Sequence, residues 1–208
     1  VTEERLVRYV PGGDLAISDV RQSADEVERW DMIEIIFVIE NSAATHPQFP
    51  YDPEPAKGLE MSDGITAEGL FSRDGWQTVY RRPAFLRQRY ERRPVDDAEW
   101  LYPEGEPVWT LRFSPPDEGE WHYRIEVQEA KGNATSETYS FRVRAPGANN
   151  RGPLRVSPTD SRYFEYADGS AFLGTGHGTG YSPERFSYDA ADHFDAIGEG
   201  NQELLRWW

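Results

Sequence analysis

The 208-residue sequence contains no cysteine, which excludes disulfides, thiolate metal ligands and a cysteine nucleophile. Its longest apolar run, Ile35–Ile39, is far shorter than the roughly 20 residues that a transmembrane helix needs. Positive charge is also scarce: 22 Lys and Arg stand against 37 Asp and Glu, for a net charge of −15. Polyphosphates and anionic membranes need a cationic surface, so we expect neither nucleic acid nor membrane as a partner.

The motifs of several enzyme classes are missing as well. The four histidines show neither H-x-x-x-H nor H-E-x-x-H spacing, so no metal site is expected, and no G-x-S-x-G serine elbow is present. Gly174–Gly180 is rich in glycine but fits neither phosphate-binding pattern, so no nucleotide or other cofactor is predicted. The residues leave the compartment open, because no charged-then-apolar leader follows Val1 and the lack of cysteine fits cytosolic and secreted bacterial proteins alike.

Strand periodicity dominates the first two thirds of the chain. Apolar and polar residues alternate in Trp109–Phe113, Trp121–Val127 and Tyr139–Val143, and turn-forming residues separate the three segments. Each segment is apolar on one side only, which predicts antiparallel strands with one face on a core and one in water. Further strands are expected at Trp30–Glu40, Ile65–Phe71 and Gln77–Phe85, with a tight turn at Arg73–Trp76. Short strands between turn signals predict an immunoglobulin-like β-sandwich.

The composition changes at Ala145–Pro153, which is rich in glycine, proline and asparagine and predicts a linker. Beyond it we expect a small hairpin around Asp168-Gly169, with Ala171–Leu173 as a strand. A helix is expected to begin at Ser182-Pro183, and Glu203–Trp208 should form a second strand. Strand, helix and strand in this order predict a βα unit that is cut off at its second strand.

Three stretches resemble a known family. Trp109–Pro115 followed by Gly119–Tyr123 resembles the "W-x-x-R-F-x-P…G-x-W-x-Y" signature of an immunoglobulin-like domain of unknown function that precedes glycoside hydrolase TIM barrels. Trp30–Ile35 resembles the opening strand of that domain. Arg151–Val156, with Tyr163–Phe172, resembles the "G-P-L-x-V…Y-F-x-Y-x-D-G-x-P-F" junction into the barrel. The likeness extends over about residues 27 to 208.

The resemblance implies a mainly β chain: an immunoglobulin-like antiparallel β-sandwich followed by the truncated βαβ start of a (β/α)8 barrel. The expected parts are an N-terminal extension or edge strand (1–26), the accessory sandwich (27–145), a linker (146–153), and the opening hairpin with the first βαβ of the barrel (154–208). The implied function is that of a non-catalytic accessory module of a carbohydrate-active enzyme. The paired glutamates of such barrels lie on later strands, so no catalytic residue is assigned and no activity is expected from this chain. Its partner would be a polysaccharide or oligosaccharide, bound through a secreted or periplasmic parent enzyme.

Candidate site residues follow from the same resemblance. His177 and Tyr181 come after the first expected barrel strand, and Arg206, Trp207 and Trp208 end the second, where barrels place substrate. In the sandwich, three aromatic residues in or next to expected turns are candidates for a sugar platform: Trp76, Trp100 and Tyr102.

Two further functions stay open. Aromatic residues on loops favour an autonomous carbohydrate-binding module, whereas their absence from one exposed plane would favour a ligand-free immunoglobulin-like structural or adhesion domain. The exposed apolar strands of an incomplete barrel would also invite association with another chain.

Overall fold

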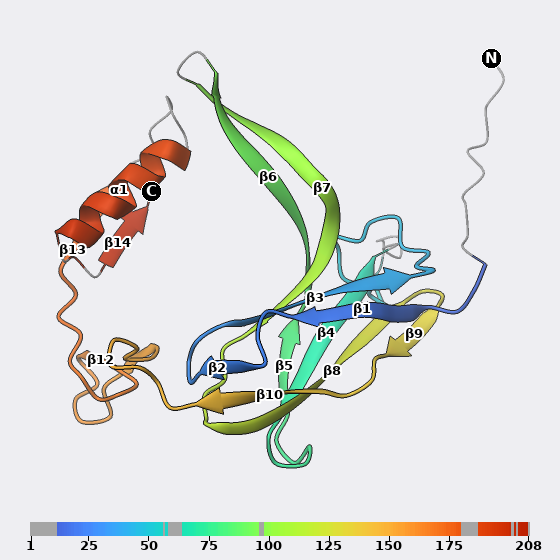
Figure 1. Ribbon diagram of the computed structural model, residues 1–208, viewed down its shortest axis with the longest axis horizontal. Helices are drawn as coiled ribbons and strands as arrows, with labels where there is room; N and C mark the ends of the chain where they lie inside the picture. The colour runs from blue at the N-terminus through green and yellow to red at the C-terminus, as the bar shows by residue number, and fades with distance from the viewer. Residues whose placement is uncertain are drawn as a thin grey trace. The chain divides into compact units, whose positions relative to one another are not determined.

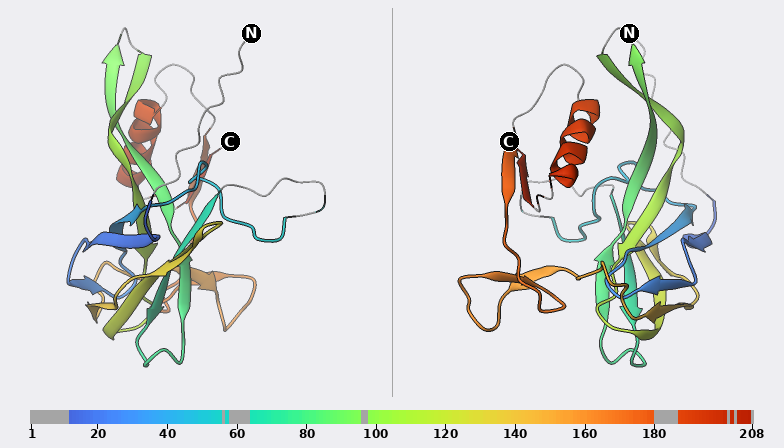
Figure 2. Two further views of the ribbon diagram at one scale, coloured as in Figure 1. Left: turned by 90° about the vertical axis from the view of Figure 1, so that its right-hand side faces the viewer. Right: turned by 60° about the vertical axis from the view of Figure 1, so that its left-hand side comes forward.

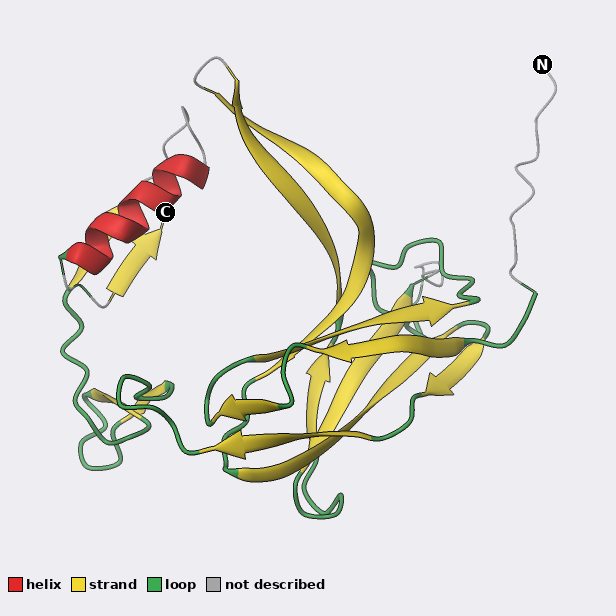
Figure 3. Ribbon diagram, viewed as in Figure 1, coloured by secondary structure: helices red, strands yellow, loops and turns green. Residues whose placement is uncertain are grey.

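The computed structural model describes residues 12–55, 57, 64–95, 98–179, 187–200, 202 and 204–207. Strands make up most of this part of the chain, and Figure 3 shows them in yellow beside one red helix. The chain divides into two compact units: Val1–Arg87 with Pro107–Asn150, and Gln88–Glu106 with Arg151–Trp208. The fold is therefore mainly β, as expected.

The first unit contains two sheets (Figure 1). Sheet A has the order β1-β3-β7-β6, with β1 at Ala16–Gln22, β3 at Ile33–Glu40, β7 at Ala98–Phe113 and β6 at Phe85–Val95. Sheet B has the order β2-β10-β8-β4-β5, with β2 at Glu26–Glu28, β10 at Tyr139–Arg144, β8 at Gly119–Glu129, β4 at Ile65–Ser72 and β5 at Tyr80–Pro83; β9 at Gly132–Thr135 also pairs with β8. Strand β1 runs antiparallel to β3, and β3 to β7; in sheet B the neighbours are antiparallel as well, apart from the parallel pair of β10 and β2.

The core lies between the two sheets, because alternate residues of each sheet point inward. Phe71 of β4 stacks on Phe113 of β7, with ring centroids 4.1 Å apart, and on Tyr123 of β8 at 5.5 Å. Trp121 packs edge-on against Phe113 at 5.2 Å, and its ring N–H donates to the Asp117 carbonyl at 2.9 Å. Since one cluster joins residues of both sheets, the first unit is a β-sandwich with one buried and one solvated face to each sheet.

Two expected strands differ from the structure. The strand expected from Trp30 begins only at Ile33, because Trp30 has a φ of 74° and donates its N–H to the Pro115 carbonyl. The single strand expected at Gln77–Phe85 is instead two strands in different sheets. Between β5 and β6, the Ala84 N–H donates to the Ala67 carbonyl at 2.8 Å, and the chain passes from sheet B to sheet A.

A two-stranded ribbon was not foreseen. Strand β7 pairs with β3 only over Trp109–Phe113, although β7 begins at Ala98. The earlier part of β7 accompanies β6 alone, and this part of the pair belongs to the second unit. Strand β6 of the ribbon carries four arginines: Arg87, Arg89, Arg92 and Arg93.

The second unit also contains two short sheets (Figure 2). Strands β11 (Leu154–Val156) and β12 (Phe164–Tyr166) pair antiparallel, whereas β13 (Gly176–Thr179) and β14 (Leu204–Trp207) pair parallel. Helix α1 (Ser187–Glu199) lies between β13 and β14 in the chain. The expected order of strand, helix and strand is confirmed. Within the described residues, β13 and β14 pair only with each other, so the start of a barrel is not shown.

The position of the first parallel strand was predicted wrongly. Ala171 forms only an isolated bridge with Glu165. The strand lies at Gly176–Thr179, within the glycine-rich stretch that was expected to follow it. A Cβ on Gly176 would lie 2.5 Å from the Leu204 carbonyl oxygen, so glycine permits the close approach of β14. Glycine residues carry no hydrophobic pattern, which is why periodicity did not reveal this strand.

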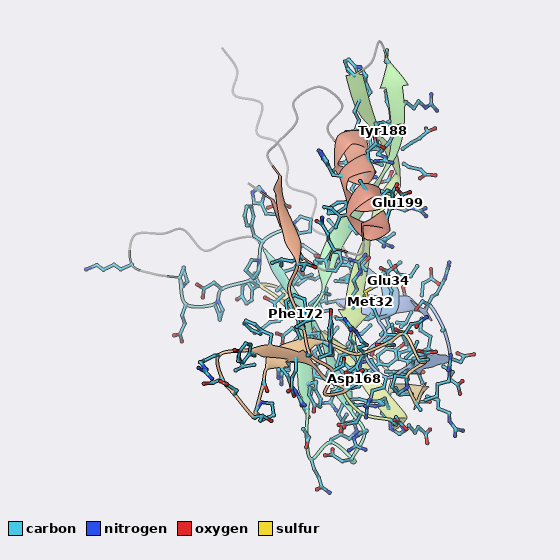
Figure 4. The ribbon with its side chains drawn as sticks, turned by 90° about the vertical axis from the view of Figure 1, so that its left-hand side faces the viewer. Met32, Glu34, Asp168, Phe172, Tyr188 and Glu199 are labelled. Carbon is cyan, nitrogen blue, oxygen red and sulfur yellow. The ribbon has the colours of Figure 1, made fainter. Side chains whose placement is uncertain are left out.

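Glu99 of the ribbon caps the N-terminal end of helix α1. The Ser187 N–H donates to Glu99 Oε2 at 2.8 Å, and the Ser187 hydroxyl donates to the other oxygen of the same carboxylate. These hydrogen bonds, that of the Ser187 side chain first, lower the pKa of Glu99. Arg92 also donates to Ser187 Oγ, and its guanidinium lies 4.4 Å from the Tyr188 ring. Figure 4 labels Tyr188 and Glu199 near opposite ends of the helix. The start expected at Ser182-Pro183 lies outside the described residues.

Candidate functional site

The expected cleft residues lie on the parallel pair of strands or outside the described residues. His177 is within β13, and Arg206 and Trp207 are within β14. The register pairs His177 with Leu205 and Gly178 with Arg206, so the two positions are one step apart on adjacent parallel strands. Tyr181 and Trp208 lie outside the described residues. The substrate cleft stays a prediction.

The three expected platform aromatics are divided between the two units, and the sugar platform stays a prediction. Trp76 belongs to the first unit, whereas Trp100 and Tyr102 belong to the second. The latter two were expected next to turns but lie in β7, where 53% of Trp100 and 44% of Tyr102 are exposed. Trp76 does lie in the turn between β4 and β5. Of the three aromatic residues, Trp76 is the one that lies beside the solvent side of sheet B, where two grooves are found.

The turn holds Trp76 in an unusual backbone conformation. Its φ is 68°, a left-handed value that costs a bulky residue about 1–3 kcal/mol. The Trp76 N–H donates to Ser72 Oγ at 3.0 Å, and the Thr78 N–H donates to Asp74 Oδ1 at 2.9 Å. The hydrogen bonds from Thr78, with smaller contributions from Ser72 and Gln77, lower the pKa of Asp74 to about 2. This network fixes the position of a half-buried indole.

A charged network begins at this indole and runs along the solvent side of sheet B. The Arg124 guanidinium lies 4.6 Å from the Trp76 ring, and its Nη2 lies 3.1 Å from Glu126 Oε1. Arg81 Nη1 lies 3.7 Å from Glu126 and 3.1 Å from Glu68. Two cations and two anions thus form one ion-paired network on this side of the sheet. We call this solvent side the polar face; its residues are Thr66, Glu68, Arg81, Glu120, His122, Arg124, Glu126, Gln128, Asn133, Thr135, Ser140 and Arg142.

Two grooves hollow the polar face. One, of about 300 Å³, is lined by three of the four charged residues and by other residues of β4, β8 and β9: Thr66, Glu68, Arg81, Glu126, Val127, Gln128, Asn133, Ala134 and Thr135. The other, of about 660 Å³, lies toward the opposite end of β8 and is lined by Asp25, Gly119, Glu120, Ser140, Phe141 and Arg142. Both volumes are in the range of small-molecule sites. Carboxylates, amides and guanidinium groups are suited to pair with hydroxyl-bearing ligands.

Other kinds of site have less support. Among the described residues, no group of three or more His, Cys, Asp and Glu side chains is placed to hold a metal ion. Within the same residues, no helix is long and apolar enough to cross a membrane. A third groove of about 330 Å³ is mainly apolar and includes Phe49, Phe85 and Trp109. It offers few groups that would orient a ligand.

The sequence reasoning missed the polar face, although its signal was visible. The polar members of the alternation in Trp121–Val127 were expected only to face water. Two of them, Arg124 and Glu126, carry opposite charges on one side of the strand, and Gln128 continues that side. The pairing with Arg81 and Glu68 depends on strand register, which alternation alone does not reveal.

Comparison with solved structures shows a likeness to a larger protein. A crystal structure described as that of "a putative glycoside hydrolase from Bacteroides vulgatus ATCC 8482" is similar to this chain, with a TM-score of 0.54 and 20% sequence identity. The likeness covers 88% of this chain and 28% of the other, so the chain spans less than a third of that protein's length. No family model matches the sequence, and no curated protein matches it. At this identity the likeness shows a shared fold.

Proposed function

We propose that this chain is the N-terminal part of a glycoside hydrolase, in which an immunoglobulin-like sandwich acts as a non-catalytic accessory module and precedes a (β/α)8 barrel. The observation that carries the proposal is the structural likeness, which takes in 88% of this chain but 28% of a larger protein described as a putative glycoside hydrolase. The sandwich would comprise residues 27–145, the linker 146–153, and the barrel start 154–208. The parent enzyme would act on a polysaccharide outside the cytoplasm.

The parallel pair of β13 and β14 supports the barrel part of the proposal. Parallel neighbours need a crossover connection, and here the connection contains α1. This strand–helix–strand unit is the repeat from which a (β/α)8 barrel is built. Neither of two alternatives, an autonomous carbohydrate-binding module and a ligand-free adhesion domain, has a need for such a unit. In the proposed enzyme, His177, Arg206 and Trp207 would lie near the substrate cleft.

The coding sequence around this segment tests the proposal. We expect it to continue into further β/α repeats that supply two glutamates at strand ends, the pair that glycoside hydrolysis uses. The complete protein should release reducing ends from at least one of a panel of plant and algal polysaccharides, and a variant lacking either glutamate should not. The 208-residue chain alone should release none. A reading frame that stops at Trp208, or repurified chain that hydrolyses glycan catalytically, would contradict the proposal.

A further inference from the structure

We propose that the polar face of sheet B binds a neutral glycan chain, with Trp76 as the ring on which a sugar packs. The ligand class rests on the proposed function, whereas the site itself rests on the geometry of the sandwich. Three observations carry it: a strained and anchored indole, a balanced set of fixed polar groups, and two grooves on the same sheet face.

The conformation of Trp76 is the first observation. A residue kept at a φ of 68° has a backbone cost that a glycine would avoid, yet the neighbouring hydrogen bonds of Ser72 and Asp74 hold the turn in this form. The indole stays half-buried beside Arg124 instead of entering the core. An amphipathic ring beside a charged residue of the polar face is suited to cover the apolar side of a pyranose, whose hydroxyls then reach polar groups of that face.

The charge balance of the groove selects a neutral ligand. Arg81 and Arg124 are already paired with Glu68 and Glu126, so an anionic sugar would have to compete with carboxylates that belong to the protein. The net charge of −15 repels a polyanion further. Neutral hydroxyls, in contrast, accept from the guanidinium groups and donate to the carboxylates without breaking these pairs.

The groups of the face are held in place before a ligand arrives. Leu70 of β4 is only 2% exposed although it lies outside the main core cluster. In register it lies between Arg81 and Arg124, whose apolar stems are suited to cover it. Ordering these long side chains in the free protein removes part of the entropy that binding would cost.

The length of the face indicates a chain of sugars instead of one ring. The two grooves lie toward opposite ends of β8, one near Glu120 and the other near Gln128. Eight residues of extended strand span about 26 Å. His122 and Arg124 lie between the grooves on the same side of the strand. Affinity should therefore rise as the oligosaccharide lengthens, until it spans both grooves.

Calorimetric titration of the 208-residue chain tests the site. The probes are cello-, xylo-, manno- and laminari-oligosaccharides of increasing length, with oligogalacturonate as the anionic counterpart. We expect saturable binding of at least one neutral series and weaker binding of the anionic one. Trp76→Ala and Gln128→Ala should each weaken binding by about tenfold, the loss that corresponds to one good contact.

Matched variants separate loss of contact from loss of folding. Trp76→Phe keeps an aromatic ring and should retain most of the binding. Tyr163→Ala removes an exposed aromatic ring from the second unit and should leave binding unchanged. Thermal unfolding of each variant reports its folding, and Gln128→Ala decides the question should Trp76→Ala fail to fold. The proposal is overturned by the absence of saturable binding to every neutral probe, by preference for oligogalacturonate, or by full affinity in both alanine variants. If the complete protein hydrolyses glycan while these variants bind normally, this inference fails and the proposed function stands.

Discussion

Gly69→Ala should destabilise the sandwich, although general strand preferences predict the opposite. Glycine in the interior of a strand is ordinarily less stable than alanine by about 0.5–1 kcal/mol. Gly69 is buried in β4 and lies opposite Ile125 of β8, on the side of sheet B that meets sheet A. A Cβ built on it would lie 2.2 Å from Leu111 Cδ2, 3.0 Å from Leu111 Cδ1 and 2.9 Å from a ring carbon of Phe71. Sheet A and sheet B therefore approach too closely here for a methyl group.

The size of the effect follows from two opposing contributions. Overpacking a well-filled core costs about 1–3 kcal/mol, and the gain in strand preference offsets at most about 1 kcal/mol of it. We expect a net loss of about 1–2 kcal/mol. Leu111 is fully buried, so Leu111→Ala should by itself cost about 2–5 kcal/mol through the cavity it leaves. In the Leu111→Ala background the contacts with Leu111 are gone, and the Phe71 ring has room to move away from the added methyl group. Gly69→Ala should then be neutral or stabilising.

Equilibrium unfolding in urea, followed by tryptophan fluorescence, measures all four members of this cycle. The interaction energy between the two substitutions should be about 1–3 kcal/mol and of the sign that favours the double variant. A loss of 1 kcal/mol corresponds to a fall in melting temperature of roughly 2–4 °C for a protein of this size. The packing argument is refuted if Gly69→Ala is as stable as the unmodified chain, or if it costs the same in both backgrounds.

Three other predictions concern a turn, a cap and a buried phenol. Trp76→Gly should be more stable than Trp76→Ala by on the order of 1 kcal/mol in thermal unfolding, because both lose the indole but only alanine keeps the left-handed strain. Glu99→Gln should speed hydrogen exchange in the first turn of α1, because it removes the carboxylate that accepts from the Ser187 N–H. The pKa of Glu99 is lowered in the folded chain, so the cap is complete above the unfolded pKa of about 4.3 and is lost as pH falls through the folded pKa. Burial raises the pKa of Tyr123, so its contribution to stability is complete below about pH 10 and is lost at higher pH; Tyr123→Phe should flatten the alkaline limb of a stability–pH profile. Equal exchange with and without Glu99, equal stability of the two Trp76 variants, or an unchanged alkaline limb would each contradict the corresponding argument.

Local pattern was enough to predict most strands of the sandwich. In Trp121–Val127 and Tyr139–Val143 the side chains alternate between core and water, and the structure confirms both strands and their faces. The alternation of side chains is a property of the extended backbone itself, so a short stretch of sequence contains it. The helix and the strand at Leu204–Trp207 were predictable for similar reasons. Tyr188, Ala191, Phe194 and Ile197 recur every three residues, and Leu204-Leu205 is a short apolar run.

Features that depend on a distant partner could not be predicted in this way. Glu129 reads as an ordinary polar residue at the end of a strand, yet it is 3% exposed. Its carboxylate accepts hydrogen bonds from the Ser42 hydroxyl at 2.5 Å and the Ala43 N–H at 2.9 Å, which lie more than 80 residues away in the chain. Strand β13 is a similar case, because its glycines form a strand through pairing with β14 and not through any pattern of their own.

The amino-acid sequence by itself thus determined the class of the fold and the positions of the alternating strands, because these depend on the chemistry of neighbouring residues. Its charge also argued against polyanionic partners. Only the tertiary structure decided that Arg81 and Glu68 meet Arg124 and Glu126 on one face, and that Trp76 lies beside them. Strand register brings these residues together from three strands and a turn. Register is set by the packing of the whole core, which no single stretch of the sequence specifies.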